Sequence, residues 1–193
     1  QPINVRNPGG VCVVTNAGSN GKFLGVLDLE FDLRGLSGYQ YRLLPVFADL
    51  LPANPDMAAY IESVEAPFRS TLDQPLAVAE DLLYRRGNFN GTFDQIICDA
   101  LRQELNAEVA LSPGFRWGTT VLPGEMITMA RVLDQTAMTY PETYVRLMQG
   151  AELKSILESV ADNLFHEDPY FQQGGDMVRS GGLSYQMNPT AEA

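Results

Sequence analysis

The sequence has a single histidine, His166, and only two cysteines, Cys12 and Cys98. A transition-metal centre built by one chain normally needs several convergent His, Cys, Asp or Glu side chains, and a histidine base needs an orienting partner. We therefore expect this chain to bind no metal by itself. Each cysteine lies inside an apolar run, which favours a small buried side chain over a disulfide or a metal ligand.

Basic residues are also scarce. The chain has 13 Lys and Arg against 24 Asp and Glu, which gives a formal net charge of −11, and no basic cluster is longer than two residues. Because a phosphate backbone requires a basic face, this charge excludes nucleic-acid binding through bulk electrostatics. Any anion that the chain binds is expected to be held locally.

Long apolar runs are missing too. None approaches the roughly 20 residues that span a bilayer, and the first residues lack the basic start and apolar centre of a secretory signal. The chain begins at Gln1 rather than Met, in an extended stretch, and it stops soon after the last expected strand. We expect a fragment of a longer polypeptide; a removed leader, an experimental boundary and a truncated gene product all stay open.

The 193 residues, 45% of them hydrophobic, suffice for one domain with a real core and a piece of another. Strand-like runs occupy residues 3–5, 11–15 and 23–33, and a Gly-rich stretch at 34–38 has the composition of a hinge. We place a domain boundary there. The Gly- and Asn-rich segment 16–22 predicts a hairpin turn, since its Gly-Lys end lacks the phosphate-loop spacing and precedes a strand.

The rest of the sequence predicts a mixture of helices and strands, an α/β (α+β) fold. A strand at 39–47 leads to a helix at 56–72 that Asn54 caps, with Pro55 at its first position and a bend or end at Pro67. Its apolar face is expected to be buried and comprises Met57, Tyr60, Ile61 and Val64.

Later elements follow from periodicity. We expect strands at 75–83, 107–111, 144–149 and 183–187, and helices at 93–105 and 150–164; residues 126–133 fit either a helix or a strand. The 150–164 helix has the clearest amphipathic spacing. Its core-facing residues are Leu153, Ile156, Leu157, Val160 and Leu164.

The segment SPGFRWG at residues 112–118 carries the strongest chemical signal. It joins a buried strand to a turn, and Arg116 lies between the rings of Phe115 and Trp117. A planar guanidinium beside apolar surface suits a sulfate, sulfonate or phosphate group. A structural cation–π stack or a surface ion pair accounts for the same pattern, and both interpretations stay open.

Two further loops are rich in candidate side chains. The segment YRRGNFNGT at 84–92 places two arginines and two amides before a helix N-terminus, which favours an anion; alternatively, Asn90 or Thr92 caps the helix while Arg85 and Arg86 are solvated. In the segment DPYFQQGGD at 168–176, aromatic rings and glutamine amides suit a channel for a glycine-rich peptide, or else form an ordinary loop with an aromatic anchor.

The order of these elements resembles the C-terminal domain of the 5'-nucleotidase family. The matching parts are residues 88–105, 107–116, 145–164 and 181–185. Three segments are similar to the sulfur-oxidation branch of that family, the SoxB-type thiosulfohydrolases. They are VTNAGSNGKFLGVLDL at 14–29, RRGNFNGTFD at 85–94 and residues 168–179.

The resemblance implies a periplasmic, monomeric hydrolase of two domains, with a manganese pair in an N-terminal metallophosphoesterase domain. Residues 1–34 would be the last strands of that domain, and 35–193 an incomplete C-terminal domain that binds substrate. The implied substrate is a cysteine S-thiosulfonate on a SoxYZ-type carrier, from which water releases sulfate. The implied manganese ligands lie outside this chain, so we expect the fragment alone to be inactive. From its acidic charge and its lack of long apolar runs, we expect it to bind neither nucleic acid nor membrane.

Two other functions stay open: a carrier-binding module without chemistry, and a phosphoester hydrolase of the 5'-nucleotidase type. By resemblance, Arg116 matches the arginine that nucleotidases place on the substrate. The glycine run that usually precedes it is replaced by residues 112–115, which argues against an ordinary nucleotide substrate. Tyr140 falls near the ring that stacks on the nucleobase. The candidates are thus Arg116 as the catalytic residue, with Arg86, Asn88, Asn90, Phe115, Trp117, Tyr140, Tyr170 and Gln173 as substrate-binding residues.

Overall fold

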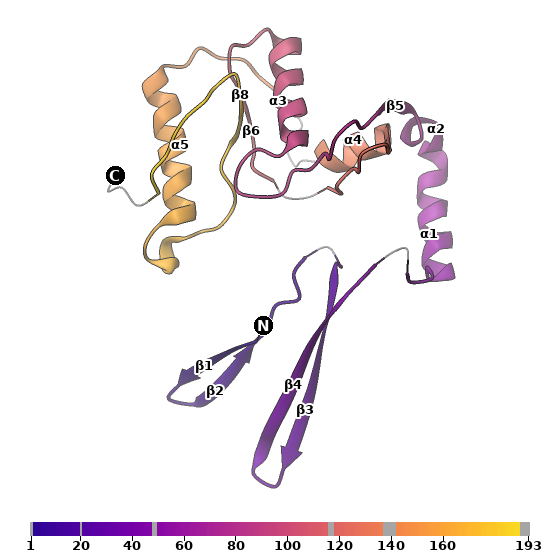
Figure 1. The fold of residues 1–193 in the computed structure, drawn as a ribbon, viewed down its shortest axis with the longest axis vertical. Coiled ribbons are helices and arrows are strands. Elements are labelled where there is room, and N and C mark those ends of the chain that lie inside the picture. Colours follow the sequence, from indigo (N-terminus) through magenta and orange to yellow (C-terminus); the bar gives the residue numbers. More distant parts are fainter. Residues whose placement is uncertain (1, 20, 48–49, 116–117, 137–141, 190–193) are drawn as a thin grey trace. The chain divides into compact units, whose positions relative to one another are not determined.

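The computed structural model describes residues 2–19, 21–47, 50–115, 118–136 and 142–189 (Figure 1). The chain divides into two compact units, residues 1–66 and 67–193. The boundary expected after residue 34 falls in the turn of a hairpin, since β3 and β4 pair on either side of it. In the described part of the chain, no helix has both the length and the apolar character needed to cross a membrane.

The first unit consists of two antiparallel hairpins and a helix. β1 (Ile3–Asn7) pairs with β2 (Gly10–Val14), and β3 (Phe23–Asp32) pairs with β4 (Gly35–Pro45). The hydroxyl of Tyr39 on β4 donates to the Asn4 side chain on β1 at 2.9 Å, which links the two hairpins. These strands were expected from the sequence, and their ends differ from the expected ones by a few residues.

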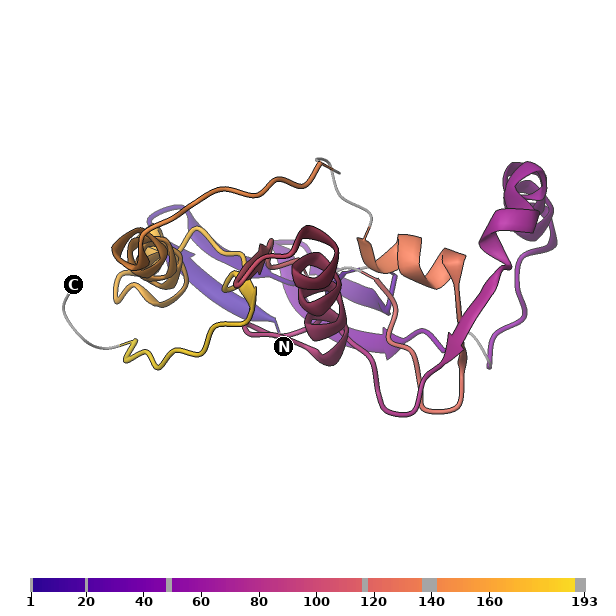
Figure 2. The same cartoon turned by 90° about the horizontal axis from the view of Figure 1, so that it is seen from above.

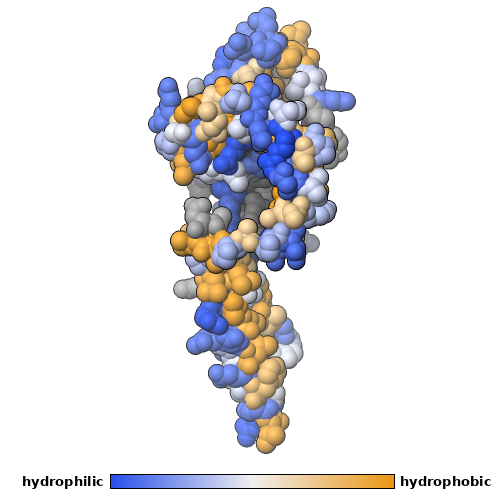
Figure 3. Space-filling view, turned by 90° about the vertical axis from the view of Figure 1, so that its right-hand side faces the viewer, coloured by the Kyte–Doolittle hydropathy of each residue, from blue (hydrophilic) through white to orange (hydrophobic). Residues whose placement is uncertain are grey.

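One face of the long hairpin is apolar because hydrophobic residues recur every second position along β3. The side chains of Phe23, Leu27, Leu29 and Phe31 are 41–69% exposed. Figure 3 shows the corresponding hydrophobic surface along this hairpin, in the lower part of the view. Cys12 on β2 is exposed as well, so the expectation that it is buried was wrong.

α1 (Pro55–Glu65) begins as the sequence predicts, with the Asn54 side chain accepting from the Met57 backbone N–H at 3.0 Å. The helix stops before Pro67 and continues as a 3₁₀ turn, η1 (Ala66–Phe68), in line with the bend expected there. Its apolar face was expected to be buried, but the four side chains are 46–66% exposed, because none of the described elements covers this face. These are Met57, Tyr60, Ile61 and Val64.

The second unit is a mixed α+β arrangement with small two-stranded sheets. Its elements are α2 (Arg69–Leu72), β5 (Pro75–Val78), α3 (Thr92–Leu105), β6 (Ala110–Ser112), β7 (Met126–Thr128), α4 (Met129–Thr136), α5 (Gly150–Phe165), η2 (Pro169–Phe171) and β8 (Arg179–Gly181). β5 pairs with β7 and β6 pairs with β8, both antiparallel. Figures 1 and 2 show the β6–β8 ribbon between α3 on one side and α5 on the other.

The core of this unit gathers where α3 meets the β5 and β7 segments. Ala79, Leu83, Phe93 and Val121 are at most 9% exposed, and Ile97 and Ile127 pack against them. A bridge between Leu83 and Val121 closes the cluster. On α5 the predicted core-facing residues are all half-buried, whereas their neighbours Lys154 and Ser155 are exposed, which confirms the predicted face.

Some expected strands of this unit were wrong or displaced. Residues 142–149 form no strand; they run as an unpaired segment into α5, with Tyr144 80% exposed. The last strand lies at β8 instead of 183–187, because Arg179, Ser180 and Gly181 are the residues that pair with β6. The undecided stretch 126–133 is a strand followed by a helix, β7 and then α4.

Candidate functional site

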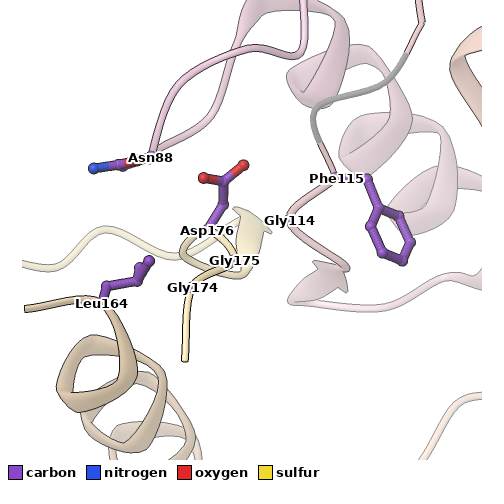
Figure 4. A pocket seen from close by; sticks show the side chains of 7 residues that line it. All are labelled: Asn88, Gly114, Phe115, Leu164, Gly174, Gly175 and Asp176. Carbon is purple, nitrogen blue, oxygen red and sulfur yellow. The ribbon is translucent and has the colours of Figure 1, made fainter. Parts of the chain in front are cut away.

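An open hollow of about 520 Å³ lies in the second unit. Its lining comes from the loop before α3, the segment after β6, the C-terminal turn of α5 and the segment before β8. Figure 4 shows the carboxylate of Asp176 between Asn88 on one side and Gly114 and Phe115 on the other. We call this hollow the pocket; it is lined by Asn88, Gly114, Phe115, Leu164, Gly174, Gly175 and Asp176.

Strand pairing brings two of these segments together. Because β6 and β8 are antiparallel, with Ser112 opposite Arg179, the chain leaves β6 at the end where it enters β8. A backbone hydrogen bond of 3.0 Å from Met177 N–H to the Asn88 carbonyl adds the loop before α3. The pocket is therefore a meeting point of segments that are far apart in the sequence.

Gly114 is needed where two of these segments touch. A Cβ atom at this position would lie 2.5 Å from the Met177 carbonyl oxygen and 2.8 Å from the Asp176 Cβ. Real Cβ atoms do not approach other atoms so closely. Glycine thus allows the backbone after β6 to pack directly against the backbone before β8.

Two arginines and an aspartate next to the pocket lining form a buried cluster. Arg85 is 2% exposed, while Asp94 and Arg179 are 0% exposed. Asp94 Oδ1 accepts from Arg85 Nε at 2.7 Å, and Asp94 Oδ2 lies 3.2 Å from Arg179 Nε. The Gly91 N–H donates to the same Oδ2 at 2.9 Å, so this carboxylate also caps α3. The alternative in which Arg85 is solvated is wrong.

Both arginines extend from this carboxylate to the segments that line the pocket. Arg85 donates through Nη2 to the Pro113 carbonyl at 3.2 Å and through Nη1 to the Gln135 carbonyl. Arg179 Nη2 donates to the Gly87 carbonyl at 2.8 Å and to Asp176 Oδ2 at 3.1 Å. Hydrogen bonds from a buried guanidinium are directional, so they fix the positions of these carbonyls.

The lining of the pocket suits an uncharged, extended chain better than an anion by itself. Asp176 is the charged residue of the lining, it is 7% exposed, and it pairs with Arg179. The remaining lining consists of glycine backbone, the Asn88 amide, the Phe115 ring and the Leu164 side chain. Anion binding here would depend on a cation brought to the rim, and Arg116 directly follows Phe115 in the chain.

The structure brings two of the predicted site residues together, since Asn88 and Phe115 both line the pocket. Asn90 contacts β8 instead: its amide donates to the Ser180 carbonyl at 2.8 Å and accepts from the Ser180 N–H at 3.1 Å. This pairing holds the loop before α3 against the β6–β8 ribbon.

The other predicted residues are not part of the lining. Arg86 is half-buried, and its Nη2 has no hydrogen-bond partner among the described residues. Tyr170, in η2, is 86% exposed and packs edge-on against Phe171, and Gln173 is exposed. Three predicted residues lie outside the described part of the chain: Arg116, Trp117 and Tyr140. The roles proposed for all these residues stay predictions.

Sequence reasoning missed the residues that organise the pocket. Asp94 has the position of an ordinary helix cap, and nothing in the local pattern indicates that it binds two arginines. Asp176 and Arg179 lie in a Gly-rich segment that resembled known relatives, which is the signal that could have identified them. Arg179 contacts Asp94 and Arg85, and both lie at least 85 residues before it in the sequence. No local sequence period can therefore indicate these contacts.

Among the described residues of this unit, two side chains have shifted pKa values. Burial, with the charges of Asp94 and Asp99 adding to it, raises the pKa of the Cys98 thiol to about 11. Burial also raises the pKa of Tyr185. Cys98 is 0% exposed on α3, so its thiol is protonated at neutral pH and is a poor nucleophile or metal ligand.

The described residues do not form a metal site, because no three or more of their His, Cys, Asp and Glu side chains lie close enough together to bind a metal ion. His166 instead stacks near Phe171, with ring centroids 5.0 Å apart, and accepts from the Asp168 N–H through Nδ1. The manganese pair implied by the resemblance has no site among these described residues.

Comparison with known proteins agrees with this architecture. Residues 76–193 match the family described as 5'-nucleotidase, C-terminal domain. The structure of the sulfate thiohydrolase SoxB of Thermus thermophilus, solved in complex with glycerol, superposes with a TM-score of 0.83 at 42% identity. That match covers 89% of this chain and 32% of the SoxB chain. Curated protein sequences gave no match.

A 5'-nucleotidase precursor, also from Thermus thermophilus, is similar with a TM-score of 0.65 at 20% identity. This match covers 94% of the chain and 36% of the nucleotidase, and it shows the fold alone. The chain thus spans about a third of the length of both solved relatives. The family profile covers more than half of the chain, residues 76–193. The chain therefore belongs to the 5'-nucleotidase C-terminal domain family, with a fold like that of SoxB.

Proposed function

We propose that this chain supplies the substrate-binding part of a thiosulfohydrolase that acts on a cysteine S-thiosulfonate carried by a SoxYZ-type protein in the periplasm. The observation that carries the proposal is the pocket between Asn88, Phe115 and the Gly174 segment, and Arg116 directly follows Phe115 in the sequence. The 42% identity to a solved SoxB across most of this chain supports the same substrate class.

The pocket suits the carrier end of such a substrate. A glycine-rich peptide has no side chains to clash with walls made of Gly114, Gly174 and Gly175, and its backbone amides can bind the Asn88 amide and the Asp176 carboxylate. Asp176 is held by Arg179, so it accepts hydrogen bonds from the peptide without being an isolated buried charge. We therefore place the carrier backbone in the pocket.

The reacting group would lie at the rim beside Phe115. In the proposed reaction, a water oxygen bonds to the terminal sulfonate sulfur, and the bond from that sulfur to the sulfane sulfur breaks. The electron pair leaves with the carrier as a persulfide, and sulfate and two protons are released. Arg116 would bind the sulfonate oxygens through its fork of N–H donors as negative charge develops on them.

The group that activates the water is not assigned to the described residues. They do not gather a metal-binding set, and we propose two manganese ions as cofactors of the full-length protein, with ligands outside this chain as the family resemblance implies. For the chain alone, the same pocket supports a second role, in which it binds the carrier and performs no chemistry.

A parallel assay with the full-length natural protein tests the proposal. One reaction contains a glycine-rich carrier peptide bearing the cysteine S-thiosulfonate, and the other contains AMP. The proposal predicts sulfate release from the peptide and little phosphate from AMP. Phosphate release from AMP without sulfate would identify a nucleotidase, and peptide binding without either product would identify a carrier-binding module.

A further inference from the structure

Arg116 lies in the segment 113–119, and the described residues at each end of that segment are linked to α4. On the upstream side, Arg85 donates to the Pro113 carbonyl at 3.2 Å and to the Gln135 carbonyl on α4. On the downstream side, Thr119 donates from its N–H and its hydroxyl to Asp134 Oδ2 at 2.7 and 2.9 Å.

Gln135 connects the two anchors. It is 1% exposed, its amide donates to the Thr119 carbonyl, and its own carbonyl accepts from Arg85. A Cβ atom on Gly118 would lie 2.6 Å from the Gln135 side chain, so the chain passes directly over this residue. Arg85 and Gln135 therefore fix the described residues on either side of positions 116 and 117, namely Pro113, Gly118 and Thr119.

Arg179 does the same for the pocket segments that carry Asn88 and Asp176. Its Nη2 is shared among the Gly87 carbonyl, the Arg85 carbonyl and the Asp176 carboxylate, at 2.8 to 3.2 Å. Gly87 precedes Asn88, and Asp176 lines the pocket itself. Arg179 thereby fixes the segments that carry Asn88 and Asp176, which lie on the same side of Phe115 (Figure 4).

Asp94 joins these two sets of contacts, because one oxygen of its carboxylate binds Arg85 and the other lies against Arg179. We propose that Arg85, Asp94 and Arg179 form a brace that fixes the pocket-lining segments relative to one another. Arg85 is then a positioning residue for the Arg116 segment, and Arg179 is a positioning residue for the Asn88 and Asp176 segments.

The chemistry of the brace supports positioning over simple stabilisation. Apolar residues of similar volume often stabilise a core as well as a buried ion pair does, whereas only a planar guanidinium can hold several carbonyls at fixed angles. Lysine keeps the charge but has no fork of donors. Arginine-to-lysine variants therefore separate geometry from charge.

The kinetic test rests on the proposed function and uses the full-length protein with the thiosulfonated carrier peptide. Because Arg179 holds the walls that bind the carrier, Arg179→Lys should raise KM by about 10- to 100-fold, the range expected for a displacement of about 1 Å. Because Arg85 holds the Arg116 segment, Arg85→Lys should lower kcat by a similar factor. A purely structural loss would leave KM unchanged in Arg179→Lys and would lower the apparent kcat of Arg85→Lys only in proportion to its loss of folded protein.

A matched control uses an exposed ion pair with the same contact distance. Arg146 Nη2 lies 2.7 Å from Glu152 Oε1, but both side chains are about half exposed. Arg146→Lys should leave kcat and KM within about twofold of the parent, because an exposed ion pair contributes little. The double variant of Arg85 and Arg179 should show non-additive losses in kcat/KM, since both arginines act through one carboxylate.

Amide hydrogen exchange of the unliganded full-length protein tests the brace without any substrate. Arg85→Lys should speed exchange in residues 113–115 and 118–121, and Arg179→Lys in 87–91 and 174–177, with exchange in α5 unchanged. The brace is refuted if both variants keep parental exchange while Arg179→Lys keeps the parental KM and Arg85→Lys keeps the parental kcat. If exchange changes as expected while the parent releases no sulfate, the brace stands and the proposed substrate is wrong.

Discussion

Removal of the Asp94 carboxylate should have one of the largest effects on stability of any single substitution in this unit. The carboxylate accepts from Arg85 Nε at 2.7 Å and from the Gly91 N–H at 2.9 Å, and it lies 3.2 Å from Arg179 Nε. Asp94→Ala leaves two buried guanidiniums with Asp176 as their remaining carboxylate partner among the described residues. Breaking a buried pair in this way costs roughly 3–5 kcal/mol in the free energy of unfolding.

The control is Glu152→Ala, which removes a carboxylate at the same 2.7 Å from an arginine but on the surface. Exposed pairs contribute roughly 0–1 kcal/mol. Thermal unfolding of the full-length protein, followed by a probe in the second unit, converts these energies to Tm. At roughly 2–4 °C per kcal/mol, Asp94→Ala should lower Tm by about 6–20 °C, against at most about 4 °C for Glu152→Ala. Equal shifts for the two variants would show that the buried cluster is not what holds these segments.

Three further predictions concern the pocket and its surroundings. Gly114→Ala should raise KM for the carrier peptide by roughly tenfold or more, because the added Cβ separates β6 from β8. Gly150→Ala is the control and should leave KM unchanged, since nothing lies within 4 Å of its added Cβ. Equal KM values for the two variants would contradict the packing argument. The Cys98 thiol has a folded pKa of about 11, above its ordinary value of 9.0, so its contribution to the free energy of unfolding is complete below pH 9 and is lost as the pH rises through 11. Denaturant titrations should therefore show a fall of roughly 2–3 kcal/mol over this range that Cys98→Ala lacks, and a parallel pH profile in both proteins would disprove it. Arg116→Lys should lower kcat for the carrier peptide by as much as roughly 1000-fold, the upper loss for one oxyanion donor, and a parental rate would remove Arg116 from the mechanism.

Local patterns in the sequence predict the helices well. The spacing of apolar residues places the 93–105 helix within one residue of α3, and it identifies the core-facing side of α5. Asn54 and Pro55 predict the start of α1 because capping depends on neighbouring residues only. Such features need no knowledge of what packs against the element.

Features that depend on distant partners could not be predicted. β8 consists of an arginine, a serine and a glycine and has no alternating apolar pattern, so only its pairing with β6 defines it as a strand. The apolar face of α1 looked like a core face, although none of the described elements covers it. Asp94 and Arg179 are far apart in the sequence, and neither has a local signal for the buried pair that they form.

Only part of the candidate site could be predicted, because its remaining residues also depend on distant partners. Asn88 and Phe115 were chosen for their loops and residue types, and both line the pocket. Arg85 was considered as an anion-binding or solvated side chain, but its three nitrogens bind protein groups. Burial of an arginine by a carboxylate from the next helix is a tertiary effect that residue type does not reveal.

The central claim is that the carrier lies in the pocket between Asn88, Phe115 and Gly174. The most direct test is hydrogen exchange of the full-length protein with a glycine-rich carrier peptide whose cysteine bears an S-sulfomethyl group, which keeps the sulfonate but replaces the scissile sulfur–sulfur bond. The account predicts slower exchange in residues 86–91, 113–118 and 172–177, with exchange in the β3–β4 hairpin unchanged. Slower exchange only at other segments, with these three unaffected by saturating peptide, would contradict it.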